Sequence, residues 1–466
     1  MKLAKVEITN FRCFESLVVD LQPDVTVVVG ANGAGKTSIL DAIAIALYEL
    51  IAANGGGGKR QRAQQRAALQ STDIRLVPGT EDSLIGREGF VQVRASATDY
   101  YPVEGFPGTT STGEPSLLEW SQSIIYRPPS EFIYDTSTSE PLSAINRYFQ
   151  EIWQEIRSSS PQALIPLPVV GYYRAHRRIT GMPNLGDIFK LDLSREEAFA
   201  NALDAGTDFR SMCQWFYLRE NAELRAKVAD RQGAYDAFPD LRAVRQALGL
   251  AIEGVERIYF DGSPPRLMIA LRDADNTVRS MEMAQLSDGY RNLLALVLDF
   301  ARRLAQAHPT WANPLEAPGI LVVDEIELHL HPRWQQTVIP SLQKIFPNTQ
   351  IVVATHSPAV LTTVRREQIL LLTADHRFEK IPDDVGTYGA ENSRVLAEVF
   401  GAHPRPQNIE TVANLRNYLG LIEVREHESE RAQSLRRELE AALGTSDPDL
   451  RRADLRIAQL KVLVKR

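Results

Sequence analysis

The segment GANGAGKTS (30–38) constrains the fold more than any other part of this sequence. It matches G-x-x-x-x-G-K-[ST], a pattern in which the backbone N–H groups of a glycine-rich loop surround a phosphate. The β-branched run PDVTVVVG (23–30) before it is typical of a strand buried on both faces, and a helical stretch follows it. This order predicts a phosphate-binding loop and disfavours the alternative, a glycine-rich turn before an ordinary helix.

Side chains of this loop would complete a nucleotide site. Lys36 is placed to reach the β- and γ-phosphates of ATP, and Thr37 is placed to bind Mg²⁺. Glycine lets backbone N–H groups turn toward an anion, and the dipole of the following helix adds to the attraction. The predicted ATP-binding residues of the loop are Asn32, Gly33, Gly35, Lys36, Thr37 and Ser38.

Two later strands end in residues that suit phosphate chemistry. The run ILVVDE delivers Asp324, a predicted Mg²⁺ ligand beside Thr37, and Glu325, a predicted general base for the attacking water. The run IVVATHS ends on His356, where a neutral imidazole can hydrogen-bond the γ-phosphate or the water. Taken alone, ILVVDE could be a strand that simply ends in acidic residues. Taken alone, IVVATHS could be a strand that ends in a capped histidine.

The segment LSDGY (286–290) opens a long helix with an apolar stripe. Ser287 offers a hydroxyl and exposed N–H groups at the helix start, and Gly289 permits close backbone approach. We expect both residues to touch a phosphate held by a second copy of the chain, because the first loop already surrounds one side of a triphosphate. The alternative is an ordinary N-cap, in which Ser287 or Asp288 bonds to the first helical turn.

The composition favours a large core without disulfides. The 466 residues are 44% hydrophobic and carry a formal charge of −7, so nucleic-acid binding would need a partner or a local patch such as KRQRAQQR (59–66). Two cysteines, Cys13 and Cys213, make neither a disulfide framework nor a zinc site, which fits a cytoplasmic location. We recognise no signal peptide and no uncharged apolar run of the ~18 residues that a membrane helix needs.

Short apolar strands that alternate with helical stretches predict an α/β fold with a mixed, largely parallel sheet. A strand pair is expected within 257–271, whereas residues 102–142 are rich in Pro, Gly, Ser and Thr and are expected to form loops. In the tail, helices near 421–443 and 448–465 should form a hairpin, with Asp447 as the N-cap of the second helix.

The order of GANGAGKTS, LSDGY, ILVVDEIELHLHP and VVATHSP resembles an ABC-type P-loop ATPase of the SMC/RecF/OLD branch, and KVEITNFRCF resembles that branch's opening strand. The resemblance implies that LSDGY is the signature motif, that IELHLHP is the D-loop and that His356 is the switch histidine. It implies a head-to-tail homodimer, or a higher oligomer, with His329 and His331 at the interface. Asp288 and Tyr290 depart from the commoner LSGGQ form.

A second resemblance points to a narrower family. FRSMCQWFYLRE (209–220), TYGAENSRVLAEVFGAHPRPQNI (387–409) and the helical tail resemble PtuA, the ATPase of Septu and retron-associated anti-phage defence systems. The resemblance implies an ATP-hydrolysing subunit that regulates a separate HNH nuclease of the PtuB kind. A retron reverse transcriptase with its nucleic acid is a further candidate partner, and DNA would be reached through the complex.

The resemblances imply a division of the chain into four parts. Residues 1–180 and 256–385 form the two halves of the ATPase lobe, 181–255 form a helical insertion, and 386–466 form a helical segment for partner docking or oligomerisation. No Q-loop glutamine can be placed; Arg174 either occupies that space or belongs to a plain basic loop. No nuclease active site is recognised in this chain. The alternative function is that of a RecF-like DNA-repair ATPase that binds DNA directly.

Overall fold

The phosphate-binding loop follows an inner strand of a six-stranded sheet. The strand order is β16-β15-β3-β14-β13-β9, and every pairing is parallel except that of β15 with β16. Every residue of β3, β13 and β14 is buried, as their apolar, β-branched sequences require. This sheet confirms the predicted mixed, largely parallel α/β fold. The strands are β3 (Val25–Gly30), β9 (Val169–Tyr173), β13 (Gly319–Val323), β14 (Thr349–Thr355), β15 (Ile369–Leu372) and β16 (Phe378–Glu379).

Residue contacts divide the chain into two compact units, Met1–Ala390 and Glu391–Arg466. This boundary lies near the predicted start of the tail at 386, and the finer division of the first unit stays a prediction.

No helix in the described ranges is both long and apolar enough to cross a bilayer. The computed structural model describes residues 1–54, 68–78, 85–87, 89–106, 108, 116–127, 131–135, 140–160, 164–175, 193–203, 209–230, 236–272 and 275–464.

Helix α1 (Lys36–Asn54) contacts both the parallel sheet and a five-stranded antiparallel sheet of order β2-β1-β6-β7-β8. From β7, the Trp120 indole N–H donates to the carbonyl of Ala46 on α1 at 2.8 Å. Strands β7 and β8 show that the loop prediction for 102–142 was wrong at 118–127 and 131–135. Trp120 and Ile124 give β7 a buried apolar face despite the polar residues around it. The strands are β1 (Lys2–Phe11), β2 (Phe14–Asp20), β6 (Phe90–Thr98), β7 (Leu118–Arg127) and β8 (Glu131–Asp135).

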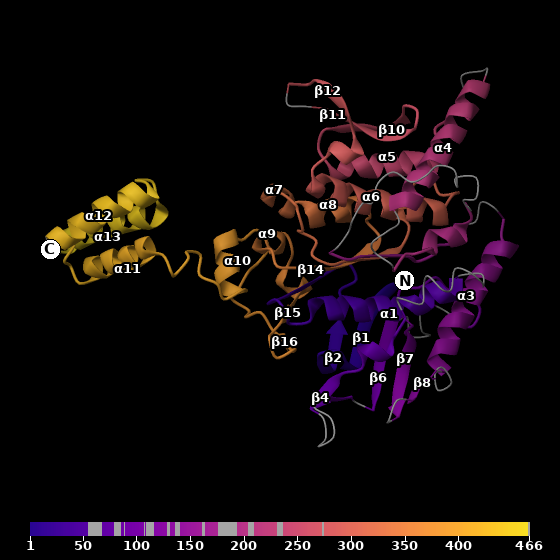
Figure 1. Ribbon diagram of the computed structural model, residues 1–466, viewed down its shortest axis with the longest axis horizontal. Coiled ribbons are helices and arrows are strands. Elements are labelled where there is room, and N and C mark those ends of the chain that lie inside the picture. Colours follow the sequence, from indigo (N-terminus) through magenta and orange to yellow (C-terminus); the bar gives the residue numbers. More distant parts are fainter. Residues whose placement is uncertain are drawn as a thin grey trace. The chain divides into compact units, whose positions relative to one another are not determined.

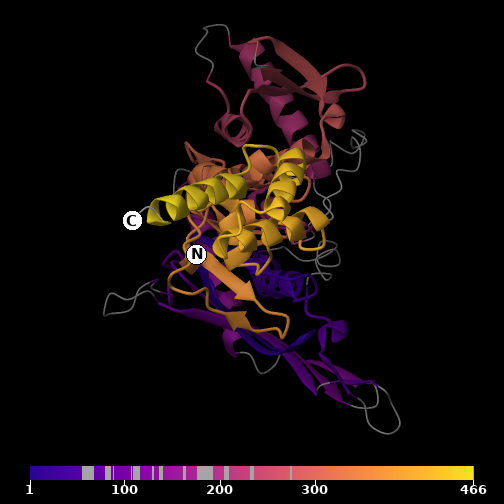
Figure 2. The same ribbon diagram turned by 90° about the vertical axis from the view of Figure 1, so that its left-hand side faces the viewer.

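A three-stranded antiparallel sheet lies at the end of the first unit opposite the five-stranded sheet (Figures 1 and 2). The expected strand pair is present as β10 and β11, and β12 adds a third strand. The ring of Phe260 on β10 packs against Phe216 and Tyr217 of α4. The elements of this region are α4 (Phe209–Ala229), α5 (Pro239–Ala251), β10 (Val255–Asp261), β11 (Arg266–Arg272), β12 (Val278–Glu282), α6 (Asp288–Ala307), α7 (Pro332–Gln335) and α8 (Val338–Ile345).

A buried ionic cluster joins α6 to the parallel sheet. Asp299 accepts hydrogen bonds from Arg302 at 2.7 Å, Arg303 at 2.8 Å and the hydroxyl of Tyr173 on β9 at 2.7 Å. Burial alone would raise the pKa of Asp299, but the two guanidinium groups outweigh it and lower the pKa to about 2. The cluster therefore holds an ionised carboxylate between α6 and the strand beside β13.

The second unit is a small helical unit with its own apolar core. The predicted helix near 421–443 is in fact two helices, because Arg425 adopts a left-handed φ of 64° and Ser429 caps a new helix by accepting from the N–H of Ala432. Asp447 caps the last helix as predicted, since its Oδ1 accepts from the N–H of Asp449 at 3.0 Å. The helices are α10 (Asn392–Glu398), α11 (Glu410–Glu423), α12 (Glu430–Leu443) and α13 (Pro448–Val464).

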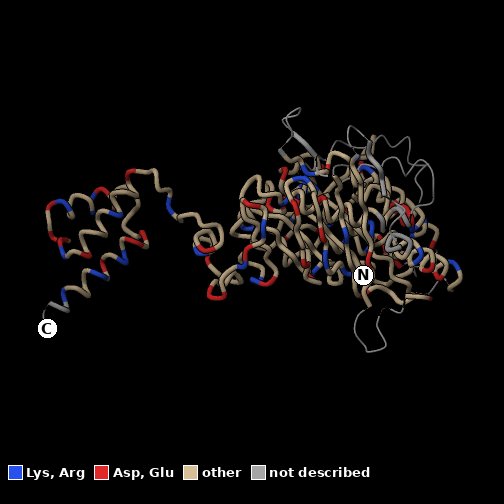
Figure 3. The backbone as a smooth tube through the Cα atoms, turned by 90° about the horizontal axis from the view of Figure 1, so that it is seen from below, with Lys and Arg blue, Asp and Glu red and all other residues tan. Residues whose placement is uncertain are grey.

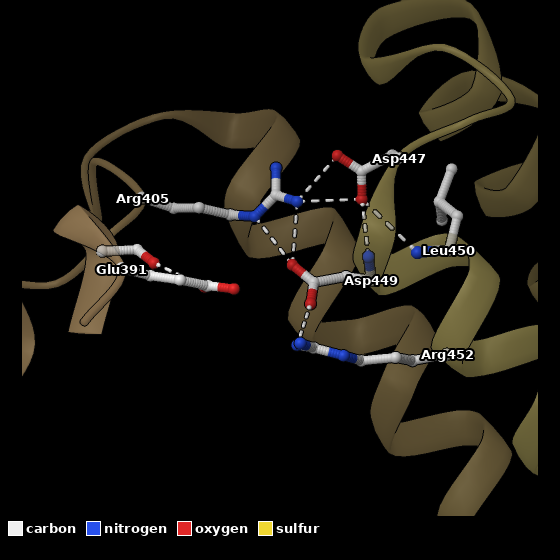
Figure 4. Close-up of polar contacts among 7 residues, drawn as sticks. Glu391, Arg405, Asp447, Asp449, Leu450 and Arg452 are labelled. Carbon is white, nitrogen blue, oxygen red and sulfur yellow. Dashed lines mark hydrogen bonds and ion pairs between the residues drawn. The ribbon is translucent and has the colours of Figure 1, made fainter. Parts of the chain in front are cut away.

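Charged residues of both signs are interspersed along the tail helices (Figure 3). Arg405 bridges the start of α13 by pairing with Asp447 at 2.7 Å and with Asp449 at 2.8 Å (Figure 4). The core beneath these helices consists of Leu415, Tyr418, Ile422, Ala432, Leu439, Leu450, Ala453 and Leu460.

The buried His308, at the end of α6, is held as a neutral tautomer. Its Nδ1 donates to the carbonyl of Leu304 at 2.9 Å, and its Nε2 accepts from the N–H of Leu167 at 3.0 Å. Burial lowers the pKa of His308 to about 3. The unfolded chain, in contrast, binds a proton at this residue below its ordinary pKa near 6.5.

We therefore expect His308 to make the protein sensitive to acid. Its contribution to stability is complete above pH 6.5 and is lost as the pH falls toward 3, at a rate approaching ~1.4 kcal/mol per pH unit. Urea unfolding of the wild type and of His308→Gln between pH 7.5 and 5 measures this difference. Parallel stability curves for the two proteins would contradict the assignment.

Candidate functional site

The phosphate-binding loop turns sharply between β3 and α1. Gly33 and Gly35 have φ values of 81° and 110°, in the region that favours glycine. A Cβ atom on Gly35 would also lie 2.6 Å from the ring of Phe14, so this position needs glycine for space as well as for conformation. Asn32 and Gly33 are exposed at the tip of the loop. The backbone therefore has the shape that the sequence pattern predicts.

Lys36 lies across the loop. Its Nζ donates to the carbonyl oxygens of Gly30 at 3.0 Å and Ala31 at 2.9 Å. Burial lowers the pKa of Lys36, while the nearby carboxylates of Asp324 and Glu325 oppose this shift. The ammonium group is thus held at the mouth of the loop, where a phosphate oxygen can replace a carbonyl as its acceptor.

The first turn of α1 contacts the end of β13. The hydroxyl of Thr37 donates to Oδ2 of Asp324 at 2.9 Å, and the N–H of Asp324 donates to the carbonyl of Tyr173 on β9 at 2.8 Å. Asp324 is only 4% exposed. A hydroxyl and a carboxylate are the oxygen ligands that Mg²⁺ prefers, so Thr37 and Asp324 together fit this ion.

Glu325 and His356 lie at the ends of neighbouring strands, because β14 is inserted between β13 and β3. Glu325 is partly buried and has a left-handed φ of 47°, an uncommon conformation for a residue with a side chain. Burial, followed by the positive charge of Lys36, lowers the pKa of His356. The lowered pKa favours the neutral imidazole, in which one ring nitrogen can donate to a phosphate oxygen and the other can accept from water.

The segment 286–290 forms the start of α6. Ser287 is exposed and occupies the N-cap position, but its side chain makes no capping hydrogen bond. The carboxylate of Asp288 accepts instead from Arg291 within the same turn, and this bond lowers the pKa of Asp288. The ordinary N-cap that was the alternative reading is therefore not observed, and the Ser287 hydroxyl has no capping role.

Gly289 has a packing role within its own chain. It is buried, and a Cβ atom there would overlap the backbone carbonyl oxygen of His329 in the segment 326–332. Beside it, the ring of Tyr290 meets Trp334 edge to face, with ring centroids 4.1 Å apart. His331 caps α7 by accepting from the N–H of Arg333 at 3.3 Å. The space beside the Gly289 backbone is thus occupied, in this chain, by the carbonyl of His329, and the expected contact of Gly289 with a partner's phosphate stays a prediction.

A carboxylate that no motif marks organises the other side of the loop. Asp41, one turn beyond Thr37 on α1, accepts from Arg12 at 2.6 Å, from the hydroxyl of Tyr172 at 2.7 Å and from Arg174 at 2.8 Å. Arg174 thus follows β9, the neighbour of β13, and is anchored toward α1. The partners of Asp41 lie 29 to 133 positions away from it in the sequence, so no local sequence pattern reveals them.

The chain matches known families and proteins over most of its length. A family model described as an AAA domain matches residues 5–227, and one described as AAA domain, putative AbiEii toxin, Type IV TA system matches residues 121–362. The retron Ec83 probable ATPase of Escherichia coli is 27% identical over 481 residues, which cover 97% of this chain and 85% of that protein. Septu protein PtuA of Bacillus mycoides is 32% identical over 396 residues, which cover 82% of this chain and 43% of that protein.

A solved structure of an Smc head bound to the winged-helix domain of ScpA is 18% identical, covers 80% of this chain and 94% of its own, and has a TM-score of 0.42. The sequence relatives confirm the resemblance to PtuA and to retron-associated ATPases. Because the second family model spans more than half of the residues, the chain belongs to the AAA-domain family described as putative AbiEii toxin, Type IV TA system.

Proposed function

We propose that this chain is the ATP-binding and ATP-hydrolysing regulatory subunit of a cytoplasmic anti-phage defence complex. The observation that carries the proposal is the contact between Thr37 and Asp324 at 2.9 Å, with Lys36, Glu325 and His356 at the same edge of the sheet. Membership in an ATPase family and similarity to a retron ATPase and to Septu PtuA support it.

The site residues divide the work of hydrolysis among them. Lys36 would exchange its carbonyl acceptors for β- and γ-phosphate oxygens, and Thr37 with Asp324 would hold Mg²⁺, whose charge would neutralise that of the phosphates. Glu325 orients the attacking water and accepts its proton. The neutral imidazole of His356 hydrogen-bonds the γ-phosphate or the water.

The second half of each site would come from a partner protomer, in a head-to-tail dimer. The exposed Ser287 hydroxyl, which makes no capping bond, is available to a phosphate on another copy. Asp288 would repel that phosphate, but its charge is paired with Arg291 in the same turn. The negative charge that Asp288 brings to this position is therefore paired within α6.

The effector of the complex would be a separate nuclease of the HNH type, docked on the helical tail, with a retron reverse transcriptase and its nucleic acid as a further candidate partner. The tail supports this role because it forms a unit with its own core and exposes Ile409, Val424 and Leu455. For the rival function, direct DNA binding by a RecF-like ATPase, the candidate basic patch is residues 59–66, which lie outside the described residues.

Replacing Glu325 by Gln should separate ATP binding from hydrolysis. The amide keeps the shape of the side chain but cannot accept the proton of the water, so turnover should fall by about 10²-fold or more. ATP affinity should stay near that of the wild type, and ATP should convert the variant to a stable dimer in light scattering. An unchanged rate of phosphate release would remove Glu325 from this role.

The variant Ser287→Ala should prevent this dimer from forming. The hydroxyl has no capping bond, so the free energy of unfolding should change by less than ~0.5 kcal/mol. ATP binding to the monomer should also be retained. We would introduce Ser287→Ala into the Glu325→Gln background and measure mass in the presence of ATP. A dimer as stable as that of the parent variant would show that Ser287 does not touch the partner's nucleotide.

The chain alone should not cleave DNA. We expect cleavage of plasmid or single-stranded DNA only after co-expression with an HNH nuclease subunit from a neighbouring gene, and we expect Glu325→Gln to alter that cleavage. Gel assays on the purified chain and on the complex measure the difference. Metal-dependent nuclease activity of the isolated wild-type chain would contradict the separation of roles.

A further inference from the structure

A single carboxylate, that of Glu327 in the segment after β13, holds the turn that carries His356. Thr355 is fully buried at the end of β14, and its hydroxyl donates to Oε2 of Glu327 at 2.7 Å. The backbone N–H of His356 donates to Oε1 of the same side chain at 2.6 Å. Both oxygens of Glu327 are therefore committed to this turn, and both bonds have a charged acceptor, which makes them stronger than neutral hydrogen bonds.

Glu327 is itself held firmly in place. It lies three residues after Asp324 in a compact turn, in which the N–H of Leu330 donates to the Glu327 carbonyl at 2.9 Å. One residue before it, the N–H of Ile326 donates to the carbonyl of Ala354 on β14 at 3.2 Å. Glu327 is thus attached to β14 in two ways, through the backbone of the adjacent Ile326 and through its own carboxylate.

A second connection joins the same two segments. The hydroxyl of Ser357 donates to Oε1 of Gln335 at 2.7 Å, and Nε2 of Gln335 donates to the carbonyl of Leu330 at 3.0 Å. The residue on either side of His356 is therefore tied to the segment after Glu325. The His356 backbone is therefore held on both sides, which limits the positions that its imidazole can reach.

We propose that Glu327 is a positioning residue for ATP hydrolysis: it holds Thr355 and the backbone of His356 so that the imidazole faces the γ-phosphate and the attacking water. The inference rests on the proposed function, since it concerns the same site. Glu327 acts through His356 and does not itself touch the nucleotide. Its loss should therefore slow the chemical step without weakening ATP binding.

The test compares Glu327→Ala, Glu327→Gln, His356→Ala and the two double variants in the full-length chain. Single-turnover hydrolysis in Glu327→Ala should slow by about 10- to 100-fold, while the Kd of a fluorescent ATP analogue changes less than about 3-fold. Glu327→Gln should recover part of the rate, because its amide oxygen still accepts from the His356 N–H. In the His356→Ala background, either change at Glu327 should have no further effect on the rate.

Glu379→Ala serves as the matched control, because Glu379 is an exposed glutamate on β16; its rate should equal that of the wild type. If Glu327→Ala fails to fold, Glu327→Gln completes the cycle with His356→Ala. A wild-type rate in the Glu327 variants, or a loss that adds fully to that of His356→Ala, would overturn the positioning role alone. A wild-type chain that binds ATP but never hydrolyses it would overturn the proposed function first and this inference with it.

Discussion

The hydrogen bond between Thr37 and Asp324 is the contact on which the candidate site depends, and the order of the strands makes it possible. Strands β3 and β13 are separated by β14, so their ends lie two strand spacings, or ~10 Å, apart. The loop after β3 and the first turn of α1 cross this gap and bring the Thr37 hydroxyl to the Asp324 carboxylate. His356, at the end of β14, then necessarily lies between the phosphate loop and Glu325.

Buried charge holds the neighbouring strand in register with this site. Consecutive residues of β9 point in opposite directions, so the hydroxyl of Tyr172 bonds to Asp41 on α1 and that of Tyr173 bonds to Asp299 on α6. Between them, the carbonyl of Tyr173 accepts from the N–H of Asp324. A buried carboxylate that lost its partners would be costly, so these bonds resist displacement of β9 relative to either helix.

The sequence predicts those parts of the molecule in which a short run of adjacent residues carries the structural or chemical role. Lys36 and Asp324 are recognisable because a glycine-rich loop and a strand ending in acids each have a short signature, and Asp447 because capping depends on adjacent residues. β7 was missed although its buried residues alternate with polar ones, because the surrounding stretch is rich in Pro, Gly, Ser and Thr, which is typical of loops. Asp41 and Glu327 were missed for a different reason: their partners come from other elements, and no pattern in one segment records them.

The short segment between β13 and α7 contacts two motifs that are far apart in the sequence, LSDGY (286–290) and IVVATHS (351–357). Its residue Glu327 holds Thr355 at the end of β14, and two positions later the carbonyl of His329 packs against Gly289 at the start of α6. Glu325 and His329 both adopt left-handed backbone conformations, which shape the segment so that it reaches both places. Close-packed contacts of this kind cannot shift independently. The position of Gly289 at the start of α6 and the position of His356 after β14 are therefore set by the same few residues.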